Sequence, residues 1–230
     1  MRIRNLLIAG LAVGIAAQAA KKDETDRLNA SAEVLKEMAT QSDKGVPKEL
    51  FDKASCAVIV PSLKKGGFIL AGKFGRGFAT CRTKTGWSAP SGVKVEGGSI
   101  GFQAGGSESD VILLVMNQAG MNRLLQSKFT LGGEASVAAG PVGRDSSAQT
   151  DATMRAEILS YSRSRGVFGG LAIQGATLRP DEDANVALYG KGVEPKAILS
   201  GEAKAPEGSG AFMTQIRRFS GSSGKPAKKS

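Results

Sequence analysis

The stretch DVILLVM, residues 110–116, decides the fold, because an unbroken apolar run follows its first residue, Asp110. A strand that is apolar on both sides must be covered on both faces, so this run predicts a central strand of a sheet. Further strand-like segments surround it, and many contain glycine, of which the chain has 31. Glycine inside strands is typical of bulges, tight bends and closely packed backbones, so we expect a coiled sheet.

The expected strands lie between helical segments. Residues 20–41 carry apolar side chains at spacings of three and four, which predicts an amphipathic helix, and residues 210–219 predict a helix near the other end. Shorter helices are expected at 47–54, 117–127 and 180–189. The expected strands are 56–60, 67–74, 77–83, 92–96, 100–105, 110–116, 128–138, 157–164 and 167–178. This order predicts an α+β fold, with one domain built on a largely antiparallel, glycine-rich β-sheet and with N-terminal and C-terminal helices.

The first 19 residues have the features of a secretory signal peptide. Arg2 and Arg4 give a basic start, residues 6–17 are apolar, and Ala17-Gln18-Ala19 is a cleavage site of the A-x-A type. The alternative is a membrane anchor, but the apolar stretch is short for a spanning helix. We therefore expect a periplasmic or secreted protein with its domain at residues 20–219. The small, polar and basic residues 220–230 predict a disordered tail.

The formal net charge is +10, and the chain remains basic when the predicted signal peptide is removed. A basic surface suits nucleic acids, anionic lipids or acidic polymers. Export argues against nucleic acid, which leaves membrane headgroups and cell-wall polymers as expected partners.

The chain has two cysteines, Cys56 and Cys81, and both fall in expected strands. An oxidising compartment permits a disulfide between them. Two buried thiols would give the same sequence pattern, so both alternatives stay open.

Histidine is absent from the sequence, which removes Ser-His-Asp and Cys-His catalysis and His-ligated metal sites. Two motifs of serine-acylating enzymes occur, Ser62-x-x-Lys65 and the triplet Lys84-Thr85-Gly86, but Ser62 follows a proline at a strand end instead of opening a helix. Gly67 and Gly72-Lys73 have the spacing of a phosphate-binding loop, yet Phe74 stands where a Ser or Thr is required.

Residues 181–185 resemble the start of a calcium loop but lack its later ligands, and the acidic first turn of a helix explains them more simply. We therefore expect no enzyme activity, no cofactor and no metal.

Basic residues are the remaining candidates for a site. Lys64 and Lys65 are adjacent, and Arg163 and Arg165 would share one face of a strand. Arg144 closes a turn rich in glycine, where backbone N–H groups can lie beside a guanidinium. A solvated surface is the simpler interpretation of any one pair, and an anionic headgroup is the functional one.

Four ordered blocks resemble the SYLF-domain family of lipid-binding proteins. They are VPSLKKGGFILAGKFGRG at 60–77, the segment 87–106 that begins WSAPSG, SDVILLVMN at 109–117, and the segment 135–191 that includes ILSYSRSRGVFGG. The resemblance implies a domain that binds phospholipids, and some eukaryotic members also bind actin. For an exported chain it implies a non-enzymatic domain that docks on anionic phospholipid or another envelope lipid. The alternative is a structural or protein-interaction module of the envelope.

Overall fold

The computed structural model of the chain describes residues 2–40, 45–67, 70–100, 105–126, 128–142, 155–164, 167–170, 173 and 175–220. Its helices are α1 (Arg2–Thr40), α2 (Lys48–Lys53), α3 (Gln118–Leu124), α5 (Glu182–Tyr189), α6 (Pro195–Leu199) and α7 (Gly210–Phe219). Its strands are β1 (Cys56–Gly67), β2 (Leu70–Thr83), β3 (Gly86–Trp87), β4 (Ser91–Ile100), β5 (Gly105–Val115), β6 (Phe129–Thr130), β7 (Val137–Ala139), β8 (Ile158–Ser164), β9 (Val167–Gly170) and β10 (Thr177–Pro180).

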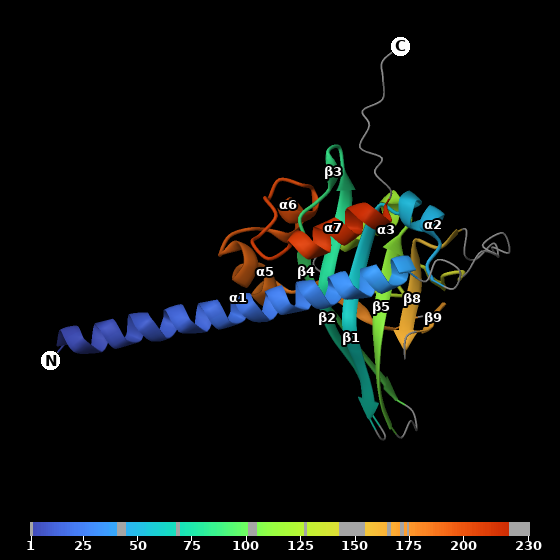
Figure 1. Cartoon of the computed structure of the whole chain (residues 1–230). Coiled ribbons are helices and arrows are strands. Elements are labelled where there is room, and N and C mark those ends of the chain that lie inside the picture. Colours follow the sequence, from blue (N-terminus) through green and yellow to red (C-terminus); the bar gives the residue numbers. More distant parts are fainter. Residues whose placement is uncertain are drawn as a thin grey trace, which may run out of the picture.

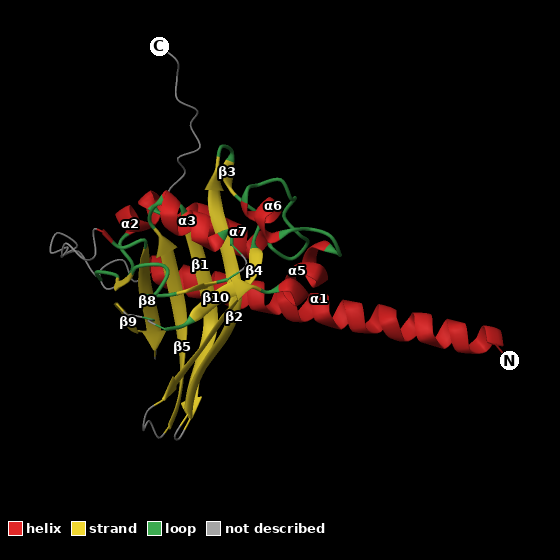
Figure 2. Cartoon of the chain, turned by 180° about the vertical axis from the view of Figure 1, so that it is seen from behind, coloured by secondary structure: helices red, strands yellow, loops and turns green. Residues whose placement is uncertain are grey.

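The strands form one sheet in the order β6-β10-β4-β2-β1-β5-β8-β7, with β3 added to β2 and β9 added to β8. Every pair of these strands is antiparallel except β7 with β8. The segment 110–116 lies within and just beyond β5, between β1 and β8, as its apolar run predicts. Helices lie on both sides of the sheet, and the α+β prediction is confirmed (Figures 1 and 2).

The core has two layers because strand side chains alternate between the two faces of the sheet. On β1, Ala57 and Ile59 face the layer that contains α1, α2 and α7, whereas Val58 and Val60 face the opposite layer. The first layer is closed by the helix residues Leu28, Leu35, Met38, Phe51, Phe212 and Ile216. The second is closed by residues of α3, β6, α6 and the turn after β6, including Leu124, Phe129, Leu131 and Leu199.

Helix α1 runs without a break from Arg2 to Thr40, so it is longer than the predicted helix at 20–41. Its C-terminal half lies across the sheet beside α7, and its N-terminal half extends away from the rest of the molecule (Figure 1). In the parts of the chain that the structure describes, no helix is long and apolar enough to cross a membrane.

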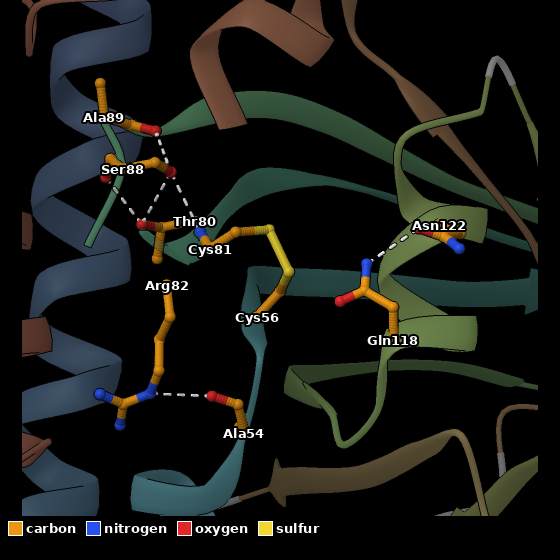
Figure 3. Close-up of a disulfide and its surroundings, with 9 residues drawn as sticks. All are labelled: Ala54, Cys56, Thr80, Cys81, Arg82, Ser88, Ala89, Gln118 and Asn122. Atoms are coloured by element: carbon orange, nitrogen blue, oxygen red, sulfur yellow. Dashed lines mark hydrogen bonds between the residues drawn. A yellow bond between two sulfur atoms is a disulfide. The ribbon is translucent and has the colours of Figure 1, made fainter. Parts of the chain in front are cut away.

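Cys56 and Cys81 form a disulfide between β1 and β2, where they lie directly opposite each other with a Cα–Cα distance of 4.0 Å (Figure 3). Both cysteines are fully buried. The backbone N–H of Cys81 also donates a 3.0 Å hydrogen bond to Ser88 Oγ, which fixes the segment after β3 against β2.

Several predicted strand boundaries are wrong. A strand was expected at 67–74, but β1 ends at Gly67 and β2 begins at Leu70, because Gly67 pairs with Ala71 around a hairpin turn. Another was expected at 100–105, but β4 ends at Ile100 and β5 begins at Gly105. The segments 128–138 and 167–178 are each divided into two short strands, and α6 was not expected. Of the predicted tail at 220–230, Ser220 is buried at the end of α7, and residues 221–230 lie outside the described residues.

Candidate functional site

Four strands extend beyond the helices as one projection, which we call the finger. It consists of residues 63–67 of β1, 70–74 of β2, 96–100 of β4 and 105–109 of β5, in the order β4-β2-β1-β5. Figures 1 and 2 show it at the opposite end of the sheet from β3. The finger contains two of the predicted site residues, Lys64 and Lys65.

The finger begins at an irregularity in β1. The pairing of β1 with β5 shifts register between Val60 and Leu63, and Ser62 has a φ of 55° within this bulge. The backbone N–H of Ser62 donates a 3.0 Å hydrogen bond to Asp110 Oδ1 on β5, which holds the bulge in place. Beyond it, the register is regular again. Ser62 is therefore a bulge residue with its backbone bound to Asp110, and it does not open a helix as an acylating serine would.

A cross-strand lysine pair on the finger carries two positive charges that form no ion pair within the described residues. Lys65 on β1 lies directly opposite Lys73 on β2, so both side chains leave the same face of the finger. Burial lowers the pKa of Lys65, and the positive charge of Lys73 lowers that pKa further, with no carboxylate opposing the shift. Like charges placed opposite each other destabilise a sheet, so an anion bound here would relieve a cost that the folded chain otherwise carries.

Lys64 is exposed and points to the other face, because neighbouring residues of a strand alternate. It lies opposite Phe74 on β2 and opposite Glu108 on β5. Phe74 is one of the few large apolar side chains that are exposed among the described residues, with 50% of its surface accessible. This face of the finger therefore offers an aromatic ring beside one lysine and two carboxylates, Glu108 and Glu96, of which Glu96 is paired with Arg179.

An open groove of about 700 Å³ adjoins the base of the finger. Its walls come from β2, β4, β6 and β10, and Lys73, Phe74 and Lys128 are among the lining residues. Two of the lining residues, Glu96 and Arg179, form an ion pair with two hydrogen bonds, from Arg179 Nε to Glu96 Oε2 at 2.9 Å and from Arg179 Nη2 to Glu96 Oε1 at 2.7 Å. These hydrogen bonds lower the pKa of Glu96. Because that pair is internally neutralised, the charges that remain in the lining are the cations of Lys73 and Lys128 and the carboxylate of Glu134, which accepts a hydrogen bond from the backbone N–H of Thr130.

Arg163 does not join this site, because its guanidinium is already occupied. Its Nε donates a 2.7 Å hydrogen bond to Asp110 Oδ2, and the guanidinium also forms an ion pair with Glu37 of α1. These contacts tie α1 to the β5–β8 part of the sheet. Arg144 and Arg165 lie outside the described residues, so the structure does not test the predicted pairing of Arg163 with Arg165.

Sequence reasoning did not identify Lys73, Phe74 or Lys128. A signal for Lys73 was present, because a hairpin centred on residue 69 places residues 65 and 73 opposite each other. The two residues between β1 and β2, Phe68 and Ile69, lie outside the described residues, and the pair Phe-Ile is not one of those that mark a tight hairpin in a sequence, so the segment resembled a continuous strand.

The spacing of Gly67 and Gly72-Lys73 is now explained by strand pairing. Gly72 lies opposite Gly66 within a regular ladder, and Lys73 lies opposite Lys65. A phosphate-binding loop needs several free N–H groups that converge on one point, and paired strands do not offer them.

Comparison with known proteins agrees with this architecture. Residues 96–219 match the model of the family described as "Ysc84: Las17-binding protein actin regulator", which is more than half of the chain. The chain is 32% identical over 169 residues to LAS seventeen-binding protein 3 of Saccharomyces cerevisiae, covering 72% of this chain and 37% of that protein. It is also 32% identical over 184 residues to SH3 domain-containing YSC84-like protein 1 of Xenopus laevis, covering 76% of this chain and 55% of that protein. The chain thus spans between about a third and about half of the length of these relatives, and it belongs to the Ysc84 family of SYLF-domain proteins.

Proposed function

We propose that this chain is an exported, non-enzymatic lipid-binding domain that docks on anionic phospholipid through the lysines of the finger. The observation that carries the proposal is the cross-strand pair of Lys65 and Lys73, which has no counter-charge among the described residues. A phosphate headgroup supplies that counter-charge, and the exposed ring of Phe74 offers apolar contact beside it. Phospholipid binding is also what the SYLF resemblance implies.

Co-sedimentation with vesicles tests the proposal. The full chain is mixed with phosphatidylcholine vesicles and with mixed vesicles that also contain phosphatidylglycerol, at low and at high salt. We expect binding to the anionic vesicles only, and weaker binding at high salt because exposed charges are screened. The double variant Lys65→Ala/Lys73→Ala should bind roughly 30-fold more weakly, since each lysine near an anionic surface contributes about 1 kcal/mol.

A variant of equal charge separates a specific site from general attraction. Lys84 and Lys191 are exposed and lie outside the finger. The control Lys84→Ala/Lys191→Ala removes two positive charges as well, and it should retain most of the binding. Equal losses in the two variants would show that net charge, and not the finger, determines binding.

Export is supported by two observations. The N-terminus has the sequence features of a signal peptide, and the buried disulfide between Cys56 and Cys81 is typical of oxidising compartments. Production of the full chain in a bacterium with a periplasm tests this part of the proposal. We expect periplasmic protein that begins at Ala20 by mass spectrometry, whereas uncleaved protein in the cytosol would contradict it.

A second function, a protein-interaction module, is favoured by the names of the relatives. The matching family is described as Las17-binding, and one relative is named a LAS seventeen-binding protein. Folded protein that binds neither kind of vesicle would transfer support to this alternative.

A further inference from the structure

The finger is charged at its base and uncharged toward its end. Lys64 pairs with Phe74 in the first row across the strands, which ends in Glu96 on β4 and Glu108 on β5, and Lys65 pairs with Lys73 in the next row. Beyond these two rows the sequence contains no charged residue from 66 to 72 or from 97 to 107. In a protein whose residues are 23% charged, the polarity therefore falls along the axis of the finger.

The row that follows the lysine pair consists of four glycines. Gly98, Gly72, Gly66 and Gly106 lie side by side on β4, β2, β1 and β5. A Cβ atom built on Gly66, Gly72 or Gly98 would meet nothing within 4 Å, and none of the three has a left-handed backbone. Packing inside the protein therefore does not require glycine at these three positions, and the protein leaves this face of the row uncovered.

We propose that the finger enters the surface of an anionic bilayer end-on, with the lysine pair at the level of the phosphates and the glycine row below it. This inference rests on the lipid-binding function proposed above and adds the orientation of the bound domain. A lysine can lie at the membrane interface with its apolar stem buried and its ammonium group in water, and phenylalanine is one of the apolar side chains that bury at the boundary between headgroups and acyl chains. Lys64 and Phe74 lie on one face of the finger and Lys65 and Lys73 on the other. The carboxylates Glu96 and Glu108 end the row of Lys64 and Phe74, and Glu96 is paired with Arg179. The part beyond these rows carries no charge that insertion would have to desolvate.

The edges of the finger limit how deeply it can enter. β4 pairs with β10 only as far as Glu96, and β5 pairs with β8 only from Asp110. Beyond those residues the outer edges of β4 and β5 have no strand partner in the described structure. Unpaired backbone N–H and C=O groups cannot be satisfied in hydrocarbon, so the glycine row should stop in the hydrated interfacial region.

Two reporter positions distinguish end-on entry from docking by one face. Gly72 lies on the Phe74 face, and Ser107 lies opposite Lys65 on the other face. The variants Gly72→Trp and Ser107→Trp place an indole on each face, at positions that are open or exposed. Trp87 is the only natural tryptophan, and it lies in β3 at the far end of the sheet, so the unmodified chain is the control (Figure 1).

The experiment measures tryptophan emission of each full-length variant with phosphatidylcholine–phosphatidylglycerol vesicles whose acyl chains are brominated near the glycerol or near the methyl end. Co-sedimentation is measured in the same samples, and circular dichroism confirms that each variant is folded. We expect blue-shifted emission and quenching at both new positions, with greater quenching by the bromines near the glycerol. Emission from Trp87 in the unmodified chain should not change.

Three outcomes would overturn the orientation. Quenching at only one position would show docking by one face, quenching at neither in protein that still sediments would exclude the finger as the inserted part, and stronger quenching by the deep bromines would exclude the shallow position. In all three cases the lipid-binding function would stand, whereas failure of the unmodified chain to sediment would reject that function itself. If Gly72→Trp does not fold, Gly66→Trp tests the same row and the same face.

Discussion

Asp181 connects three parts of the molecule although its side chain is fully buried. Its Oδ1 accepts a hydrogen bond from the backbone N–H of Ala184, which caps α5. The same oxygen forms an ion pair with Lys94 on β4 at 3.1 Å. The other accepts from Arg76 on β2, which in turn binds Glu24 of α1. A buried carboxylate is tolerated only when it is paired in this way.

The first prediction concerns Asp181→Asn. The amide removes the buried negative charge that Arg76 and Lys94 share and leaves only Glu24 and the exposed Asp183 to balance these cations, so the free energy of unfolding should fall by about 3 kcal/mol. Urea denaturation measures this change. Asp183→Asn is the matched control, because Asp183 also pairs with Lys94 but its side chain is 86% accessible. This substitution should lower the free energy of unfolding by no more than about 0.5 kcal/mol. Equal effects of the two substitutions would contradict the assigned role.

The second prediction is the pH dependence of the same residue. Burial alone would raise the pKa of Asp181, but the hydrogen bonds from Arg76, Ala184 and Lys94 outweigh it and the pKa is lowered. A carboxyl group with a lowered folded-state pKa stabilises the protein above its unfolded pKa of about 3.9, and this contribution is lost as the pH falls through the folded value. The stability difference between the unmodified chain and Asp181→Asn should therefore be constant near neutral pH and should shrink below about pH 4. A difference that is unchanged in acid would show that charge is not its source.

At the scale of single strands, the glycines of β2 have two distinct roles. A Cβ atom on Gly77 would lie 2.0 Å from the carbonyl oxygen of Ile59 and 2.7 Å from Cα of Val60, so β1 and β2 could not approach as they do. A Cβ atom on Gly72 would meet nothing within 4 Å. The close approach of β1 and β2 therefore requires glycine at position 77, whereas position 72 has room for a larger side chain.

This contrast gives the third prediction. Gly77→Ala should lower the free energy of unfolding by about 3 kcal/mol because backbone atoms must move apart. Gly72→Ala should be neutral or should stabilise by roughly 0.5 kcal/mol, because alanine restricts the unfolded chain more than glycine does. Thermal unfolding of the two variants compares them within one strand, and a large loss in Gly72→Ala would mean that the finger packs against a group not seen here.

The disulfide between β1 and β2 gives the fourth prediction. It closes a loop between residues 25 apart in the sequence, and such a cross-link stabilises a protein by about 2–4 kcal/mol. Urea unfolding of the unmodified chain should shift by this amount when reductant is added. The variant Cys56→Ala/Cys81→Ala should not respond to reductant, and an equal response in both would assign the shift to another cause.

Sequence reasoning succeeded for elements whose own residues specify them. The apolar run at 110–116 predicted the central strand β5, and α7 begins and ends where it was predicted. It failed where pairing between strands decides the structure, as between β1 and β2, because the sequence there contains none of the residue pairs that mark a hairpin. The candidate site follows the same division. Lys64 and Lys65 were found as neighbours in sequence, whereas Lys73 joins them only through the hairpin register.

For the whole molecule, α1 has two parts that differ in their relation to the domain. Residues 18–20 are exposed, and the buried side chains of the described part begin at Glu24 and include Leu28, Leu35 and Met38. The N-terminal half of the helix projects from the body (Figure 1). The predicted cleavage after Ala19 therefore falls before the first of these buried side chains.

The last prediction tests this division by truncation. A chain that begins at Ala20 should unfold at the same urea concentration as the full chain, because it keeps every described contact of α1 with the sheet and with α7. A chain that begins at residue 41 should not fold, since loss of even one buried Leu or Met side chain costs about 2–5 kcal/mol and the total stability of a domain is about 5–15 kcal/mol. Circular dichroism and urea denaturation of the two truncated chains distinguish these results. Marked destabilisation of the chain that begins at Ala20 would mean that residues 1–19 belong to the folded domain, which would contradict their assignment as a cleaved signal peptide.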